Sequence, residues 1–173
     1  MVKRMDHGLS YTNEIYFKDG SGKEITSPRY HFSGDTLFFL KKSNFISTPT
    51  VMIRKNVLAK QRFDESLNGH EDWDLYLRLA YEGVKFLYIN QPLTKIRIRN
   101  DSATYNTDIM DKSRGEVGLK ARALWKRLKK RMNPFTLDGV KAIIRYAKLR
   151  ILAMCIGFPW HTRFNTKVPH ELL

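Results

Sequence analysis

Residues 71–81 read Glu71-Asp72-Trp73-Asp74-Leu75-Tyr76-Leu77-Arg78-Leu79-Ala80-Tyr81, and the fold prediction starts from this stretch. Its apolar side chains recur at the spacing of one helix face: Trp73, Leu77, Ala80 and Tyr81. Gly83 follows at a position where glycine commonly ends a helix. Asp74 and Arg78 stand four residues apart, so we expect them to form an ion pair at the surface or at the edge of a cleft. The stretch therefore predicts an amphipathic helix that begins with two carboxylates, Glu71 and Asp72.

Short strand and helix patterns lie on both sides of this helix. The predicted strands are Leu9–Phe17, with Tyr11, Ile15 and Phe17 on one face, then Thr50–Arg54, Lys85–Ile89 and Leu93–Arg99. Gln91-Pro92 separates the last two strands. The other predicted helices are Asp35–Lys42, Asn56–Gln61, Asp108–Met132 and Leu137–Ile156, and Phe63–Gly69 is a loop. This mixture favours the α/β class over a helical bundle.

The charge of the chain is concentrated in its last third. The 173 residues include 31 Lys+Arg and 17 Asp+Glu, a net charge of +14. Residues 1–106 carry 16 basic and 12 acidic side chains, a net +4, and residues 107–173 carry 15 and 5, a net +10. We therefore expect a catalytic-type domain over residues 1–106 and a basic helical extension over residues 107–173.

Three roles are open for the basic extension. It can be a helix pair packed on the domain with its charges in water. Its basic helices, with Trp125, Phe135, Phe158 and Trp160, also suit the surface of an anionic membrane. Nucleic acid is the least favoured partner, because no nucleic-acid-reading motif accompanies the charge.

The composition excludes several other classes of protein. A single cysteine, Cys155, excludes a disulfide scaffold and a multi-cysteine zinc site. The five histidines show no metal-ligand spacing. The longest apolar run, residues 151–160, is about half the length of a membrane span. We expect a cytoplasmic protein, with a peripheral position on the inner face of the membrane if the extension binds lipid.

Glu71 and Asp72 alone allow two interpretations. Carboxylates at a helix start satisfy free backbone N–H groups and are favoured by the helix dipole. A carboxylate at such a loop-to-helix junction can also act as a general base, if it lies within hydrogen-bond reach of an attacking hydroxyl. The pair by itself does not decide between them.

Four stretches taken together carry a resemblance to a known family. They are Thr48–Lys55, the loop Phe63-Asp64-Glu65-Ser66-Leu67, the helix Glu71–Ala80, and the strand Gln91-Pro92-Leu93 through Arg97. Their order and spacing resemble the C-terminal half of the catalytic domain in family 2 glycosyltransferases, the inverting group with a GT-A fold. The resemblance covers residues 9–104. It implies a partial GT-A fold, followed here by a basic α-helical tail.

The resemblance implies a catalytic role for the start of the helix. Asp72 matches the general base, which removes the proton of the acceptor hydroxyl as that oxygen attacks the anomeric carbon. A single displacement of this kind inverts the anomeric centre and needs no carboxylate nucleophile. Glu71 matches an acidic neighbour on the acceptor side. Trp73 can stack on a sugar, although its place in the apolar stripe favours core packing.

Substrate-binding roles follow for four further residues. Asp64 and Glu65 match the loop before the base, where we expect them to form the loop first and contact ligand second. Arg97 matches an arginine at the edge of the nucleotide-diphosphate pocket. Arg99 stands where the family commonly has a histidine. An arginine cannot ligate a metal, but it can neutralise a diphosphate leaving group.

The nucleotide-binding half of the family is the largest departure. A βαβ region that ends in a D-x-D metal motif precedes the matched part in the family, and it holds Mg²⁺ or Mn²⁺. Asp72-Trp73-Asp74 has the D-x-D spacing but lies inside the helix. The eight residues before Leu9 are too few for a βαβ unit. We therefore expect an N-terminally truncated transferase: a fragment, one half of a split enzyme or a degenerate remnant.

The resulting hypothesis is transfer of a sugar from a nucleotide-diphosphate donor to a hydroxyl acceptor, glycan or lipid-linked, with inversion. Cell-surface polysaccharide or glycan synthesis is the expected setting. The isolated chain is expected to be inactive without a donor-binding half on a separate chain. The alternative is a non-catalytic scaffold or binding module that keeps the half-fold.

Overall fold

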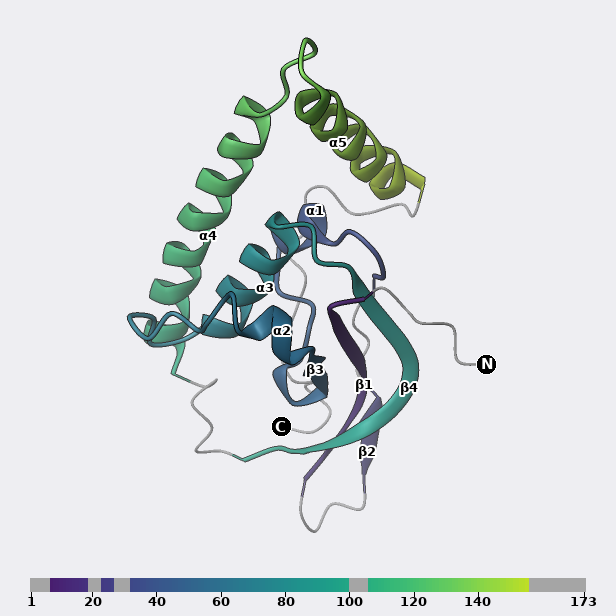
Figure 1. Ribbon diagram of the computed structural model, residues 1–173. Coiled ribbons are helices and arrows are strands. Elements are labelled where there is room, and N and C mark those ends of the chain that lie inside the picture. Colours follow the sequence, from purple (N-terminus) through teal and green to yellow (C-terminus); the bar gives the residue numbers. More distant parts are fainter. Residues whose placement is uncertain (1–6, 19–22, 27–31, 100–105, 156–173) are drawn as a thin grey trace.

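The computed structural model describes residues 7–18, 23–26, 32–99 and 106–155, with the backbone alone at residues 149 and 152–155. Phe158, Trp160 and the side chain of Cys155 lie outside this description. Strands and helices are interspersed along the chain, so the predicted α/β class is confirmed. Figure 1 shows the strands gathered at one side of the molecule, with α4 (Thr107–Lys130) and α5 (Leu137–Cys155) meeting at an angle.

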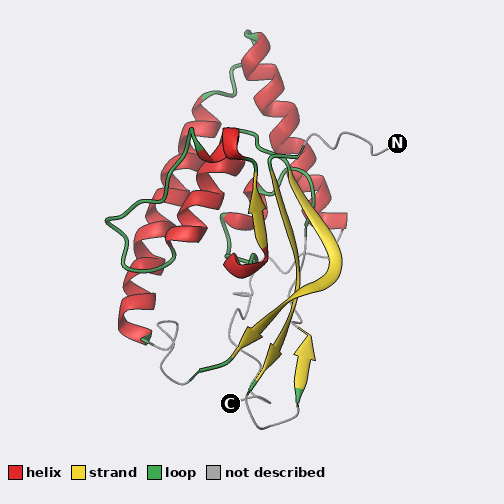
Figure 2. Ribbon diagram, turned by 60° about the horizontal axis from the view of Figure 1, so that its bottom comes forward, coloured by secondary structure: helices red, strands yellow, loops and turns green. Residues whose placement is uncertain are grey.

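A small mixed sheet is built around β1 (Leu9–Phe17), whose predicted bounds are confirmed. β2 (Glu24–Thr26) pairs antiparallel with one end of β1, and β3 (Val51–Ile53) pairs antiparallel with the other end. β4 (Phe86–Arg97) pairs parallel with β1 along its whole length. Figure 2 shows β1 and β4 as the two long strands of the sheet.

β4 runs as one strand through Pro92, where the sequence predicted two strands. Its pairing with β1 shifts register on both sides of Asn13, which lies opposite Pro92. Such irregularities absorb extra residues and provide a position where the missing N–H of a proline breaks no ladder hydrogen bond. The prediction of two strands was therefore wrong.

The same register shift changes which face of β1 is buried. Tyr11 is buried before the shift, whereas Glu14 and Tyr16 are buried after it. Of the three residues expected on one face, Tyr11 is therefore buried, whereas Ile15 and Phe17 are only half-buried. Glu14 is only 1% exposed, and the Tyr16 hydroxyl donates a 3.1 Å hydrogen bond to its Oε1.

α3 (Glu71–Tyr81) is the helix predicted from residues 71–81, and its bounds are confirmed. Gly83 follows with φ 86°, the left-handed conformation that glycine adopts without strain. Three short helices precede α3: α1 (Leu37–Leu40), the 3₁₀ helix η1 (Thr48–Thr50) and α2 (Lys55–Leu58). All four side chains of α1 are buried, and α1 packs against α3.

α4 covers the other side of α3 and belongs to the main core. Asn106 caps it, because its side chain accepts a 3.2 Å hydrogen bond from the Ile109 N–H. One face of α4 contributes four buried side chains to the cluster that also holds α1, α3 and β1: Val117, Ala121, Trp125 and Leu128. The first helix of the basic extension is thus packed on the domain. The boundary at residue 106 stays a prediction.

Candidate active site

Asp72 lies half-buried in the first turn of α3, where three donors orient its carboxylate. Its Oδ2 accepts hydrogen bonds from Asn44 Nδ2, at 3.2 Å, and from Thr48 Oγ1. Its Oδ1 accepts from the Trp73 N–H at 2.6 Å. Asn44 lies in the segment between α1 and η1, and Thr48 is the first residue of η1, so residues distant in sequence hold the carboxylate in place. Sequence reasoning missed this role for both residues, because nothing in their local pattern marks a partner for Asp72.

Tyr76 lies one turn further along α3 and completes this cluster. Its side chain is 1% exposed. Burial and the negative charge of Asp72 raise the pKa of Tyr76, while a hydrogen bond with Thr48 opposes the shift. The phenol therefore stays neutral across the physiological range. Thr48 connects the buried phenol to the carboxylate, and this limits the movement of Asp72.

His70 precedes the two carboxylates with an unusual backbone. Its φ of 55° is the one positive φ of a non-glycine residue in the described part of the chain. The Nδ1 of His70 lies 2.9 Å from Ser113 Oγ on α4. Burial lowers the pKa of His70, although the charge of Asp72 opposes this. The contact with α4 thus holds the strained residue that sets where α3 begins.

Trp73 belongs to the core, as the packing alternative predicted. Its side chain is 5% exposed, and the indole Nε1 donates a 2.7 Å hydrogen bond to the Leu40 carbonyl. A buried indole with its N–H satisfied stabilises the junction between α1 and α3. Glu71, its neighbour across Asp72, is exposed.

Asp64 takes part in forming its loop, as predicted, and Glu65 is exposed. Asp64 Oδ1 accepts hydrogen bonds from the Ser66 N–H, at 3.0 Å, and from Ser66 Oγ, at 2.6 Å. Its Oδ2 lies 2.5 Å from Lys120 Nζ on α4. The hydrogen bond from Lys120 and those from Ser66 hold the pKa of Asp64 well below its usual value.

The predicted ion pair between Asp74 and Arg78 is confirmed, and both residues line a cavity between α3 and α4, although Asp74 itself is buried. Its side chain is 2% exposed and contacts Arg78 Nε at 2.8 Å and Lys120 Nζ at 3.3 Å. Arg78 also donates to Gln61 Oε1 and to the Arg62 carbonyl. The sequence did not predict the burial of Asp74, because α4 covers this side of α3 and brings Lys120 to both Asp64 and Asp74.

Replacing Lys120 with Met should therefore reduce stability in a pH-dependent way. The folded pKa of Asp64 lies below its ordinary 3.8. The ionised carboxylate therefore stabilises the fold in full above pH 3.8, and this stabilisation is lost as the pH falls through the folded pKa. Burial alone would lower the pKa of Lys120, but its hydrogen bond to Asp64 and the charge of Asp74 raise it above 10.5. Protonated Lys120 therefore stabilises the fold in full below pH 10.5, and this stabilisation is lost at higher pH.

Urea unfolding at several pH values measures this effect. We expect Lys120→Met to lower the unfolding midpoint most between pH 4 and 10, with a smaller difference from the wild type in stronger acid. Lys126→Met is the matched control, since Lys126 is an exposed lysine on the same helix. Equal midpoints for both variants at neutral pH would show that the Lys120 contacts contribute nothing.

Arg97 and Arg99 make no hydrogen bond with Asp72. Arg97 ends β4, with its guanidinium 5.8 Å from the centre of the Phe17 ring, and Arg99 follows the strand. Both arginines are exposed, and neither is among the hydrogen-bond partners of Asp72. The structure thus groups Glu71, Asp72 and Trp73 on one helix and leaves the two arginines on a separate element.

A basic groove of about 590 Å³ borders the cluster between α4 and the segment that follows α1. Asn44, which holds Asp72, is part of its wall. The other lining residues are Lys41, Lys42, Ser43, His70, Trp73, Asp111, Arg114, Gly115, Gly118 and Arg122. The lining therefore has four cationic side chains and one carboxylate, Asp111, which pairs with Arg114 at 3.4 Å. This balance favours an anionic ligand beside Asp72.

The described residues supply no donor set for the expected Mg²⁺ or Mn²⁺. Among them, no three His, Cys, Asp or Glu side chains are grouped closely enough to hold a metal ion. Within the same residues, no helix combines the length and the apolar character that a bilayer crossing requires.

Two curated proteins resemble parts of the chain, and no protein-family model matches it. An 89-residue stretch is 32% identical to an uncharacterized glycosyltransferase of Methanocaldococcus jannaschii, and covers 50% of this chain and 30% of that protein. A 49-residue stretch is 43% identical to the amylovoran biosynthesis glycosyltransferase of Erwinia amylovora, and covers 28% of this chain and 16% of that protein. The chain thus spans less than a third of the length of either relative. These partial similarities support a glycosyltransferase.

Proposed function

We propose that this chain is the acceptor-side half of an inverting family 2 glycosyltransferase with a GT-A fold. It transfers a sugar from a nucleotide-diphosphate donor to a hydroxyl acceptor in the synthesis of a cell-surface polysaccharide or glycan. The observation that carries the proposal is the Asp72 carboxylate, oriented by Asn44, Thr48 and the start of α3. The partial similarity to two glycosyltransferases supports the same reaction class.

The proposed chemistry requires one proton acceptor on the acceptor side. Two carboxylate oxygens offer about four acceptor positions, and three donors occupy part of this capacity, so Asp72 can accept a further hydrogen bond from a sugar hydroxyl. As the hydroxyl oxygen attacks the anomeric carbon, its proton passes to Asp72. The bond from the anomeric carbon to the phosphate oxygen breaks, and the nucleoside diphosphate leaves with the electron pair. One displacement from the opposite side inverts the anomeric centre.

The groove beside Asp72 narrows the proposed acceptor to an anionic molecule. Lys42 and Arg122 line the groove and have no charged partner among the described residues. Lys41 and Arg114 add to the positive charge of the groove. A phosphate that links a glycan to a lipid would place anionic oxygens within reach of these side chains. We therefore propose a phosphate-linked acceptor whose hydroxyl reaches Asp72 while its phosphate occupies the groove.

The donor site is proposed to be shared with a second half of the enzyme. Arg97 and Arg99 suit the oxygens of a diphosphate, because guanidinium groups bind them through paired hydrogen bonds. A nucleotide-binding half with a D-x-D motif would supply the divalent cation. That half is proposed to be a separate chain or another segment of a longer one.

A transfer assay tests this function directly. The full 173-residue chain is incubated with labelled uridine- and guanosine-diphosphate sugars and phosphate-linked lipid acceptors, alone and together with a nucleotide-binding half of a family 2 enzyme. We expect labelled product only when both halves are present, and less product with acceptors that lack the phosphate. If no donor and acceptor combination gives product in the presence of both halves, the chain is a scaffold or binding module instead.

A further inference from the structure

α5 presents its apolar side to solvent, the reverse of the usual arrangement for a helix packed on a domain. Its contacts with the core are made by Ala142 and Tyr146, and Arg145 reaches from the same side to the body. The large apolar side chains on the remaining surface are exposed: Leu137, Val140, Ile143, Ile144 and Ile151. Leu137 and Ile151 keep 71% and 60% of their surface accessible. The apolar side of α5 is therefore only partly covered by the described residues.

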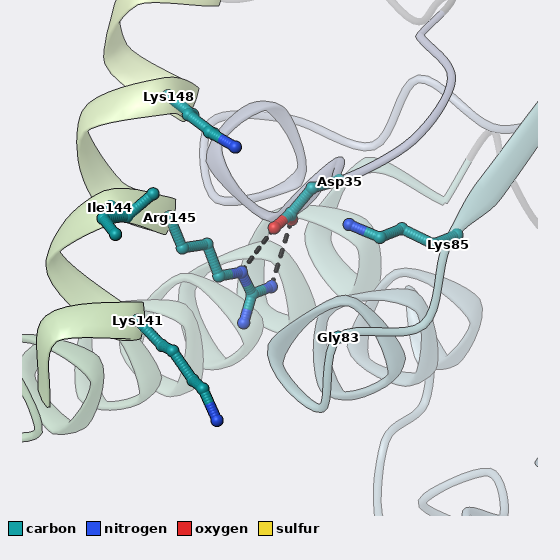
Figure 3. A pocket seen from close by; sticks show the side chains of 7 residues that line it. All are labelled: Asp35, Gly83, Lys85, Lys141, Ile144, Arg145 and Lys148. Carbon is teal, nitrogen blue, oxygen red and sulfur yellow. Dashed lines mark hydrogen bonds and ion pairs between the residues drawn. The ribbon is translucent and has the colours of Figure 1, made fainter. Parts of the chain in front are cut away.

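Arg145 fixes this orientation of the helix. Its guanidinium contacts both carboxylate oxygens of Asp35 and donates to the carbonyls of Ala80 and Tyr81 at the end of α3. Figure 3 shows Arg145 reaching from α5 to Asp35. A paired guanidinium and carboxylate with two further carbonyl acceptors resists rotation of the helix. The exposed apolar side is thus held outward by a specific contact.

Cations flank the apolar side of α5. At 100° per residue, Lys141 and Lys148 lie on one flank of the stripe formed by Leu137, Ile144 and Ile151, and Arg150 lies on the other. Lys141, Ile144 and Lys148 also line a cavity of about 420 Å³, together with Lys85, the residue just before β4 (Figure 3). Apolar side chains bordered by lysine and arginine are the pattern of helices that lie in the interface of an anionic bilayer.

We propose that α5 docks the protein on the surface of an anionic membrane. Ile144, Ile151 and Leu137 enter the boundary between headgroups and acyl chains, while Lys141 and Lys148 contact the phosphates of the lipids. A bilayer fits better than a protein partner, because one apolar stripe and two cationic flanks match a flat surface that is apolar below and anionic above. The inference rests on α5 alone and stands whether or not Asp72 is a catalytic base.

Vesicle flotation with the full chain tests the proposal. Vesicles of phosphatidylcholine alone are compared with vesicles that also contain phosphatidylglycerol. We expect binding to the anionic vesicles only. Replacing Lys141 and Lys148 with Glu should weaken binding by roughly 30-fold or more, since each basic side chain near the surface contributes about 1 kcal/mol.

Two further variants separate the apolar contribution from charge and folding. Ile144→Glu combined with Ile151→Glu should weaken binding by roughly 10-fold or more. Leu119→Glu, on an exposed apolar residue of α4, should leave binding unchanged. Circular dichroism checks that each variant remains folded.

The proposal fails if the wild type binds neither vesicle or binds both equally, or if the α5 variants float like the wild type. It also fails if sedimentation shows a dimer that only the isoleucine variants dissociate, with no lipid binding, because the apolar side would then be an interface between two copies. These outcomes do not depend on sugar transfer, so they are distinguishable from a failure of the proposed function.

Discussion

Asp72→Asn is expected to lower the rate of sugar transfer by about 10²–10⁴-fold, the usual contribution of a positioned general base. Asparagine has nearly the same shape and can still accept from the Trp73 N–H, but its amide does not take up the hydroxyl proton. Substrate affinity should change little, because the groove side chains and the arginines remain. The measurement is kcat and KM of the two-half enzyme with the variant and with the wild type.

Glu71→Gln is the matched control for this prediction. Glu71 is the exposed neighbour of Asp72 on the same helix turn and carries the same charge. If the two carboxylates merely stabilise the start of α3, both variants should lower the unfolding free energy by about 0.3–1 kcal/mol and leave kcat unchanged. A general base at Asp72 predicts a large loss of kcat for that variant and a small one for Glu71→Gln. Equal rates for Asp72→Asn and the wild type would contradict the assignment.

Trp73→Ala is expected to lower the unfolding free energy by about 3–5 kcal/mol, the range for removing a buried aromatic side chain. The indole is almost fully buried between α1 and α3 and donates to the Leu40 carbonyl. The substitution would leave a cavity and an unpaired carbonyl. For a chain of this length, the loss corresponds to a fall in Tm of roughly 10 °C. Calorimetry or thermal circular dichroism measures it.

Trp73→Phe separates packing from hydrogen bonding. Phenylalanine keeps most of the apolar contact but has no N–H. We therefore expect the lost hydrogen bond to lower the unfolding free energy by about 1 kcal/mol, in addition to the effect of the smaller side chain. If Trp73 instead served to stack on a sugar, Trp73→Ala would raise KM and leave the unfolding free energy unchanged. That result would contradict the placement of this side chain in the core.

Local patterns in the sequence predicted the longer elements well, whereas β2 (Glu24–Thr26) was not predicted. The spacing of the apolar residues gave the bounds of α3, and Gly83 gave its end, because both signals act within a few residues of the helix. The strand Leu9–Phe17 was predicted for the same reason. The prediction failed at Pro92, since proline usually interrupts a strand and only the pairing partner reveals the bulges that accommodate it.

Contacts between distant elements could not be predicted from these patterns. Asp74 lies outside the apolar stripe of α3, so periodicity predicted a surface or cleft-edge pair with Arg78, and only the position of α4 explains the burial of Asp74 beside Lys120. Asn44 and Thr48 carry no pattern that marks them as partners of Asp72. The outward apolar side of α5 follows from the anchor between Arg145 and Asp35, two residues 110 positions apart.

The anomeric configuration of the product tests the central claim most directly. The wild-type chain, together with a nucleotide-binding half, transfers a sugar from an α-linked nucleotide-diphosphate donor, and proton NMR reads the new linkage. Attack by an acceptor hydroxyl activated at Asp72, in one displacement, predicts a β linkage. A product that keeps the α configuration would contradict the assignment of Asp72 as the base of an inverting transferase.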